Sequence, residues 1–376
     1  MKIAVNTRLL IKNKLEGIGW FTYETLRRLT EAMPEAQFYF LFDRDPHPDF
    51  LFGKNVTPVV IGPQARHPFL FVAWFEYSVP RALQRIRPDV FLSPDGYLSL
   101  RTSVPQLAVM HDLNFEHFPE DLPFLVRKYY RIFFPRFAAK AKRIATVSEF
   151  SKGDIVDSYG IDPGRIDVVY NGANEMFVPL ASAAADEVRK QYTGGRPYFY
   201  FVGSLHPRKN LARLFTAYGR FRENTGEETA LLIVGEKKWW TAEIRGAYEA
   251  NPFREDILFT GRLEPEDLCK VTASALASVY VSYFEGFGIP IVEAFRCGVP
   301  VITAAATATQ EVAGDAALCV DPFDTDAIAG AMERVAGDAH LRDTLSRKGK
   351  ERAREFTWDK TAARLKSSLL RTLGDN

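Results

Sequence analysis

The chain has 376 residues, of which 47% are hydrophobic and 25% charged, and its 48 basic and 47 acidic residues leave a formal net charge of +1. This composition is ordinary for a globular enzyme and excludes a disordered chain, a collagen-like repeat and a coiled coil. Because domains typically have about 150 residues, the length predicts two of them. So small a net charge gives no general field for nucleic acid, and an anionic ligand would need a local site.

The cysteines and the apolar runs indicate where the protein acts. Cys269, Cys297 and Cys319 form no CxxC pair and are odd in number, which indicates reduced structural thiols in a cytoplasmic protein. The apolar run that opens the sequence is too short for the core of a signal peptide. No run of about 18 apolar residues occurs, so we expect no membrane-spanning helix.

Short apolar runs alternate with helical patterns along the whole chain, which is the order typical of parallel sheets covered by helices. The predicted strands of the first half are 2–6, 38–42, 56–61, 90–92, 106–110, 143–147 and 167–170. Those of the second half are 198–202, 230–234, 257–260, 278–283, 299–303 and 317–320. Helical patterns include 23–29 and 150–159, with Ser148 as the N-cap of the latter.

Thirteen strands are too many for one domain of this class. The clearest break is the segment 171–196, which contains Pro179, an Ala/Ser stretch and two consecutive glycines. We therefore predict an α/β protein of two doubly wound, Rossmann-like domains, 1–178 and 179–356. The last helical pattern, assigned to 357–376, is expected to pack back on the N-terminal domain.

In parallel α/β sheets, ligands bind beyond the carboxyl ends of the strands. Polar or glycine-rich segments follow the predicted strands of both halves, and the clearest are 17–19, 111–112, 203–210, 235 and 285–288. Two such sheet edges that face each other would form a cleft, and we expect the functional site there.

The strongest indication of a bound anion is GSLHPRKN at 203–210. Pro207 suits the first turn of a helix, which would place Arg208 and Lys209 at the positive end of the helix dipole, where cations are disfavoured. Two cations and a helix N-terminus in one place favour a bound anion, most often a phosphate. The alternative is that both side chains simply point into solvent.

A second junction of strand, glycine loop and helix lies at 285–293, EGFGIPIVE. Pro290 would open this helix and Gly298 would close it, while the glycines let backbone N–H groups approach a ligand. Glu293 is expected in the first turn. Because a carboxylate can accept both hydrogens of a vicinal diol, two carboxylates near a phosphate site suggest a nucleotide sugar. The alternative is that Glu293 only complements the helix dipole.

Other features are weaker. The GIG sequence at 17–19 lacks the third glycine of a dinucleotide fingerprint and would equally suit a tight turn. His111 follows a predicted strand and is a candidate for substrate contact, although an isolated histidine is more often structural. The aspartates at 43–45 and 324–326 are predicted to lie in solvated loops, and no zinc spacing, GxSxG or Walker motif occurs.

The stretch 122–148 has no acidic residue and carries seven basic residues interleaved with aromatic ones. A basic, aromatic helix can lie on an anionic membrane, and the aromatic segment 67–75 would extend such a face. Pro135 would kink the helix. The alternative is an ordinary helix with a solvated basic side. The hypothesis is peripheral membrane contact, or contact with a lipid acceptor, through 67–75 and 124–143.

Together these segments resemble the retaining glycosyltransferases of the GT-B fold, group 1 or family 4. FEGFGIPIVEAFRCGVPVIT, at 284–303, is similar to the family's E-x7-E signature, with Glu285 and Glu293 eight positions apart. Other segments that resemble the family, in its order, are GIGWFTYETL, HDLNFEHFPE, ATVSEFSK, VVYNGAN, FVGSLHPRKNL, LLIVGE and FTGRL.

The resemblance implies a role for each matching residue. Glu293 would bind the ribose hydroxyls of the donor, Glu285 the transferred sugar and diphosphate, and Lys209 would neutralise the diphosphate leaving group. Gly19 would let its loop close over the diphosphate, and His111 would lie by the sugar. The expected catalytic residues are His111, Arg208, Lys209 and Glu285. The expected donor-binding residues are Gly17, Gly19, Gly203, Ser204, Gly235, Arg262, Leu263, Gly286, Phe287, Gly288 and Glu293.

The sequence departs from the family at one position. The family often has arginine directly after the glycine of the 198–203 segment, where this chain has Ser204. Arg208 is expected to supply the missing charge. Since fixed cations would stabilise the leaving group, neither a metal nor a cofactor besides the donor is expected.

The implied activity is retaining transfer of a hexose, with mannose from GDP-mannose expected, to a glycan or lipid-linked acceptor in surface polysaccharide synthesis. The N-terminal domain would bind the acceptor and the C-terminal domain the nucleotide sugar. Alternatives within the fold are a UDP-sugar transferase, such as one for glucose, and an epimerase or phosphorylase. Outside it stand a non-catalytic nucleotide-sugar-binding module and an NAD(P)-dependent dehydrogenase, for which the glycine loop is incomplete.

Overall fold

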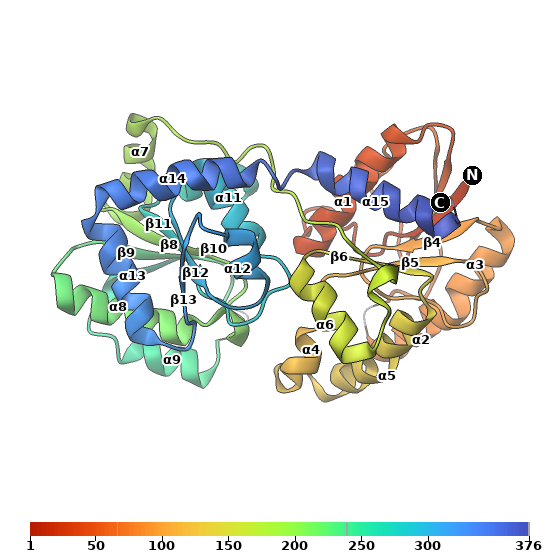
Figure 1. Ribbon diagram of the computed structural model, residues 1–376, viewed down its shortest axis with the longest axis horizontal. Coiled ribbons are helices and arrows are strands. Elements are labelled where there is room, and N and C mark those ends of the chain that lie inside the picture. Colours follow the sequence, from red (N-terminus) through yellow and green to blue (C-terminus); the bar gives the residue numbers. More distant parts are fainter. Residues whose placement is uncertain (66, 238–239, 375–376) are drawn as a thin grey trace. The chain divides into compact units, whose positions relative to one another are not determined.

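The computed structural model describes residues 1–65, 67–237 and 240–374 (Figure 1). The chain forms two compact units. Unit 1 comprises Met1–Gly172 and Trp358–Asn376, and unit 2 comprises Ala173–Thr357. The crossings between the units thus fall at 172–173 and 357–358, beside the predicted boundaries at 178 and 356.

Unit 1 is built on a seven-stranded parallel sheet. Its strands, in spatial order, are β3 (Val56–Val60), β2 (Gln37–Phe42), β1 (Lys2–Asn6), β4 (Val90–Ser93), β5 (Gln106–Met110), β6 (Arg143–Thr146) and β7 (Ile166–Val168). Its helices are α1 (Gly17–Ala32), α2 (Pro68–Ala73), α3 (Val79–Ile86), α4 (Asn114–His117), α5 (Phe124–Lys140), α6 (Glu149–Tyr159) and α15 (Trp358–Leu373). A π-helical turn, Trp74–Ser78, joins α2 to α3.

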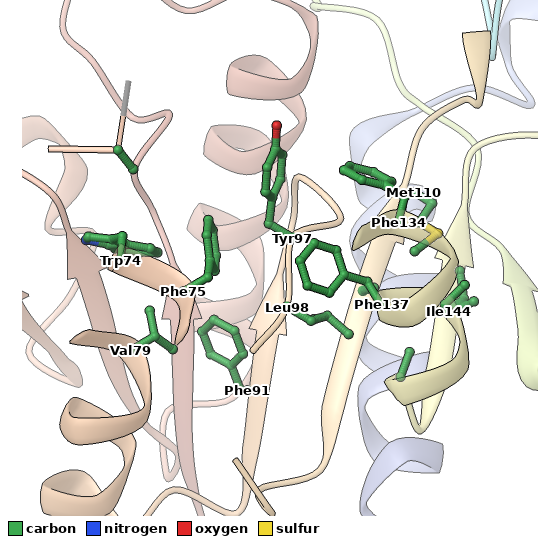
Figure 2. Packing of buried hydrophobic residues seen from close by; sticks show 14 of the residues in the cluster. Trp74, Phe75, Val79, Phe91, Tyr97, Leu98, Met110, Phe134, Phe137 and Ile144 are labelled. Carbon is green, nitrogen blue, oxygen red and sulfur yellow. The ribbon is translucent and has the colours of Figure 1, made fainter. Parts of the chain in front are cut away.

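Aromatic side chains fill much of the core on one face of this sheet (Figure 2). Phe75 stacks on Tyr97 at 5.2 Å between ring centroids, and Phe134 of α5 forms a T-shaped pair with Tyr97 at the same distance. Phe137, one turn further along α5, is fully buried beside them. The apolar side of α5 therefore faces the core, where it places some of the chain's 29 phenylalanines.

Unit 2 is built on a six-stranded parallel sheet. Its strands, in spatial order, are β10 (Ile257–Gly261), β9 (Ala230–Val234), β8 (Tyr198–Val202), β11 (Ala277–Tyr280), β12 (Val301–Ala304) and β13 (Leu318–Val320). Its helices are α7 (Ser182–Thr193), α8 (Leu211–Thr225), α9 (Ala242–Glu249), α10 (Pro265–Ala273), α11 (Ile289–Cys297), α12 (Thr307–Ala313), α13 (Thr325–Gly337) and α14 (Ala339–Ala353).

The sequence-based prediction of two parallel α/β sheets is confirmed, and each of the thirteen predicted strands is present. The largest difference is in β11, which ends at Tyr280 rather than 283, because the following residues turn away to meet the 207–209 segment through a Tyr283 N–H bond to the Arg208 carbonyl. Ser148 caps α6 as predicted, accepting a hydrogen bond from the Ser151 N–H at 3.0 Å. The α5 helix continues through Pro135. No helix among the described residues is both long and apolar enough to cross a membrane.

The C-terminal helix α15 packs on unit 1 along α1, as predicted. Its buried residues recur at helical spacing, from Trp358 through Leu365 to Thr372. The Ser368 hydroxyl donates to the carboxylate of Asp167, the middle residue of β7, at 2.6 Å. Gly172, at the other crossing, approaches the start of α15 so closely that a Cβ there would lie 2.4 Å from the Trp358 nitrogen. Only glycine fits at this position.

We predict that Gly172→Ala destabilises the protein, because the new methyl group must displace the backbone of Trp358. The expected cost of about 2 kcal/mol corresponds to a melting temperature lower by about 4–8 °C. The matched control is Gly153→Ala at an exposed position of α6, where a Cβ meets nothing within 4 Å and alanine favours the helix. Differential scanning fluorimetry measures both. Equal melting temperatures for the two variants would contradict this packing of α15.

Candidate donor site in unit 2

The carboxyl ends of β8 and β9 meet at two glycines. Gly203 and Gly235 both have φ of +151°, and the Gly203 N–H bonds to the Val234 carbonyl at 3.0 Å. A Cβ at Gly235 would lie 1.9 Å from the Gly203 carbonyl oxygen. Because no side chain fits there, the backbone forms the floor of this sheet edge. Ser204 is exposed just beyond it.

The next segment corrects one prediction. Pro207 does not open α8: Pro207–Lys209 form a separate 3-10 turn, and α8 begins only at Leu211. Asn210 ends the turn in the left-handed conformation, with φ of 63°. Its side-chain amide donates to the Val281 and Pro322 carbonyls at 3.0 and 2.6 Å, which holds it there. Arg208 and Lys209 therefore lie in a turn before the helix rather than in its first turn.

Both cations of this turn bind one carboxylate. The Lys209 Nζ lies 2.5 Å from Glu285 Oε1, and an Arg208 terminal nitrogen lies 2.7 Å from Glu285 Oε2. The Tyr280 hydroxyl accepts a hydrogen bond from Lys209 and donates to Glu285 at 3.0 Å. The Lys209 ammonium also lies 4.7 Å from the centre of the Tyr280 ring. Lys209 and Glu285 are both buried. We call Arg208, Lys209, Tyr280 and Glu285 the charge cluster.

Glu285 is ionised in this setting. Burial alone would raise the pKa of its carboxyl, but the charges of Arg208 and Lys209 and their hydrogen bonds outweigh burial and lower the pKa to about 2. Two cations against one carboxylate leave the charge cluster with one net positive charge. It is therefore suited to an anion.

The segment after Glu285 forms the predicted glycine loop. Gly286, Phe287 and Gly288 are all buried. Gly288 is the N-cap of α11, with φ of +100°, and Pro290 lies in the first turn. Gly298 ends the helix with φ of +72°. The predicted end at Gly298 is confirmed, whereas the helix begins at Ile289, one residue before the predicted start at Pro290.

Thr307 supports the glycine loop from the start of α12. Its hydroxyl accepts the Glu285 N–H at 3.2 Å. Its φ is +52°, which is unfavourable for a β-branched residue and is tolerated where the surroundings impose it. Sequence reasoning missed Thr307 and Tyr280. A polar residue at the end of β11 was the only available signal for Tyr280, and nothing in the sequence indicates the conformation of Thr307.

Glu293 does not lie where it was predicted. It is in the second turn of α11, because the helix begins already at Ile289. No hydrogen bond or ion pair joins its half-buried side chain to any other described residue. Burial is the main reason why the pKa values of Tyr200, Cys269 and Cys297 are raised, and the charge of Glu293 raises them further. The Glu293 carboxyl therefore lies among these three groups and apart from the charge cluster. Burial raises the pKa of Glu293 to about 8.

The remaining donor-site predictions occupy the same sheet edge. Arg262, which is exposed, and Leu263 follow β10 directly, and the Gly235 N–H bonds to the Gly261 carbonyl at 2.9 Å. The structure thus brings Gly203, Gly235 and Arg262 to neighbouring strand ends. In the described residues, no three His, Cys, Asp or Glu side chains gather as metal ligands.

The predicted residues of unit 1 lie at the edge of its own sheet. His111 Nε2 donates to the Pro94 carbonyl at 2.8 Å, which leaves Nδ1 as an acceptor, and burial lowers the pKa of the ring. Gly17 begins α1, and a Cβ on Gly19 would lie 3.2 Å from the Leu15 side chain. Sequence reasoning missed Arg8, whose buried guanidinium binds Asp95 at 2.7 Å.

Two family models together cover most of the chain. Residues 15–176 match "Glycosyltransferase Family 4", and residues 185–352 match "Glycosyl transferases group 1". With the sheet edges described above, these matches define the class: the chain belongs to the family 4, group 1 glycosyltransferases of the GT-B fold.

The relatives of this chain include two O-antigen mannosyltransferases. The chain is 29% identical to O-antigen chain mannosyltransferase B of Escherichia coli, over 96% of this chain and 97% of that one. It is 26% identical to O-antigen chain mannosyltransferase RfbU of Salmonella typhimurium, over 64% of this chain and 63% of that one.

Solved structures with the same fold are more distant in sequence. Sucrose-phosphate synthase from Thermosynechococcus elongatus superimposes with a TM-score of 0.77 at 20% identity, covering 99% of this chain and 98% of that one. Anabaena HepE in complex with UDP and glucose superimposes with a TM-score of 0.78 at 16% identity, covering 99% and 100%.

The raised pKa of the Glu293 carboxyl predicts how the stability of the protein depends on pH. Between pH 4.5 and 8 the unfolded carboxyl loses its proton while the folded one keeps it, so the free energy of unfolding falls as pH rises through this window. We expect Glu293→Gln to abolish this fall in the free energy of unfolding, which amounts to at most about 1.4 kcal/mol per pH unit. Urea unfolding at pH 5.5 and 7.5 measures it, with exposed Glu266→Gln as control. Parallel pH curves for wild type and Glu293→Gln would contradict a Glu293 that keeps its proton in the folded state.

Proposed function

We propose that the chain is a retaining, metal-independent mannosyltransferase that uses GDP-mannose in surface polysaccharide synthesis. The observation that carries the proposal is the charge cluster, which holds two cations beside the glycine floor of the unit 2 sheet edge. The similarity to O-antigen chain mannosyltransferase B over nearly the whole of both chains supports mannose and polysaccharide synthesis.

The charge cluster fits a nucleoside diphosphate as leaving group. As the bond between the sugar C1 and the diphosphate oxygen breaks, negative charge grows on that oxygen. Lys209 and Arg208 are already fixed by Glu285 and Tyr280, so they can stabilise this charge without first being ordered. Because these fixed cations supply the electrostatic stabilisation, the proposed reaction needs no metal.

The proposed transfer balances without a further reagent. The acceptor hydroxyl oxygen forms the new bond to C1 on the same face that the diphosphate leaves. Its proton passes to the departing diphosphate oxygen, so the products are the glycoside and GDP. Retention of configuration rests on the family resemblance, and the front-face route is proposed because no nucleophilic carboxylate is evident.

The other half of the proposal concerns the sugar, the ribose and the acceptor. Glu293 is proposed to bind the ribose hydroxyls once it has lost its proton, which makes donor affinity rise towards pH 8. His111, with Nδ1 as an acceptor, is proposed to bind a sugar hydroxyl. We assign the acceptor, a glycan or lipid-linked glycan, to unit 1. The reaction is proposed to take place in the cytoplasm at the inner face of the membrane.

We predict that Lys209→Ala lowers kcat by about 100-fold or more, since one preorganised donor to the developing charge is lost. The protein should still fold, because Arg208 continues to pair with Glu285. The measurement is GDP release from GDP-mannose with a lipid-linked glycan fraction as acceptor, alongside the melting temperature. Lys270→Ala, an exposed lysine on α10, is the control. Wild-type turnover of Lys209→Ala would remove Lys209 from the mechanism.

The donor can be identified by its effect on thermal stability. A ligand that binds only the folded state raises the melting temperature in proportion to its affinity and concentration. We predict that GDP-mannose raises it more than UDP-glucose or ADP-glucose at equal concentration. A larger shift with UDP-glucose would make the chain a UDP-sugar transferase, and a flat response to all three would overturn the proposed nucleotide-sugar site.

A further inference from the structure

Two neighbouring helices of unit 1 each expose apolar side chains. Phe69 and Leu70 of α2 are 68% and 37% exposed, and Phe124, Leu125 and Ile132 of α5 are 64%, 44% and 39% exposed. Among the described residues, no other large apolar side chain is as exposed as Phe69 or Phe124. The helices are neighbours (Figure 1), joined by Phe71 and Tyr129, whose ring centroids are 5.5 Å apart.

The outer side of α5 also carries cations. Lys128, Arg131, Arg136 and Lys140 are exposed between and beyond its apolar residues. None of the four forms an ion pair with a carboxylate in the described parts of the chain, although the charge of Lys140 acts on the carboxyl of Glu76. The stretch 122–148 itself contains no Asp or Glu. In a chain with a net charge of only +1, this is a concentrated positive stripe. We call these four cations and the five exposed apolar residues the α2–α5 surface.

The α5 helix, which carries most of this surface, is firmly anchored. Tyr129, Phe134 and Phe137 on the inner side of α5 are buried in the aromatic core of unit 1 (Figure 2 shows Phe134 and Phe137). The Tyr97 hydroxyl bonds to that of Tyr130 at 2.8 Å, which adds a polar tie. The outer side chains are therefore presented by a fixed helix, so their exposure is not the result of a loose segment.

We propose that the α2–α5 surface docks on a bilayer that contains anionic phospholipid. Exposed Phe, Leu and Ile can enter the boundary between head groups and acyl chains while lysine and arginine ammonium and guanidinium groups stay among the phosphates. A protein partner is a poorer fit, because the centres of protein interfaces are depleted in lysine. A second copy of the same surface would bring two positive stripes together. A nucleic acid would bind the cations through its phosphates but would leave the exposed Leu and Ile side chains in contact with water.

Docking deepens the proposed function by supplying the partner of unit 1. A lipid-linked acceptor is confined to the membrane, so a surface that holds unit 1 there raises the acceptor concentration it meets. This consequence rests on the proposed function, whereas membrane binding does not depend on which sugar is transferred.

The test is flotation of the 376-residue chain with vesicles of phosphatidylcholine alone, or of phosphatidylcholine with about 30% phosphatidylglycerol. We expect binding to the anionic vesicles that is at least 10-fold stronger than to the neutral ones and that weakens as salt rises. Phe69→Ser with Phe124→Ser, and separately Lys128→Glu with Arg131→Glu, should each weaken binding at least 10-fold. Matched controls are Val60→Ser with Val178→Ser, and Lys190→Glu with Lys270→Glu, all at exposed positions elsewhere.

The controls separate this proposal from the proposed function. Every variant should keep the wild-type thermal shift with GDP-mannose, which shows that unit 2 still binds its donor. Three outcomes would each overturn the membrane proposal and leave the proposed function intact. The protein could fail to float while its thermal shift with GDP-mannose is unchanged. The surface and control variants could lose binding equally, or the wild type could bind neutral vesicles as strongly as anionic ones. Concentration-dependent dimerisation that Phe69→Ser with Phe124→Ser abolishes would instead assign the surface to a second copy and would also overturn it.

Discussion

The charge cluster is the interaction on which the functional half of the structure depends. Glu285 holds Lys209 and Arg208 at the carboxyl edge of the unit 2 sheet, and the Tyr280 hydroxyl bridges Lys209 to Glu285. A buried ion pair is seldom a source of stability, because desolvation offsets much of the Coulomb attraction. In this protein the ion pairs with Glu285 instead fix the positions of Arg208 and Lys209 before an anion binds.

The two glutamates of the E-x7-E segment lie in opposite electrostatic environments. Glu285 faces two cations, which lower the pKa of its carboxyl to about 2, whereas Glu293 has burial without a partner, which raises its pKa to about 8. At neutral pH one is a carboxylate and the other largely a carboxylic acid. A ligand with hydroxyl groups would supply the partners that the folded chain does not provide for Glu293.

The two sides of the α5 helix of unit 1 lie in different environments. Its inner aromatic residues complete the core, while its outer residues combine exposed hydrophobic groups with unpaired cations. The sequence predicted a basic, aromatic helix but could not assign its rings. Because Tyr129, Phe134 and Phe137 belong to the core, the α2–α5 surface contains fewer aromatic residues than the sequence indicates.

The sequence by itself determined both sheets, because buried parallel strands appear as short apolar runs between helices. Its motif spacing also predicted the residues of the candidate donor site. It misplaced the start of α8 and the turn of Glu293, since helix ends depend on neighbours such as the carbonyls that bind Asn210. Only the tertiary structure paired Glu285 with Lys209, separated Glu293 from them and revealed Tyr280. These contacts join residues far apart along the chain, and no local pattern encodes the distance between them.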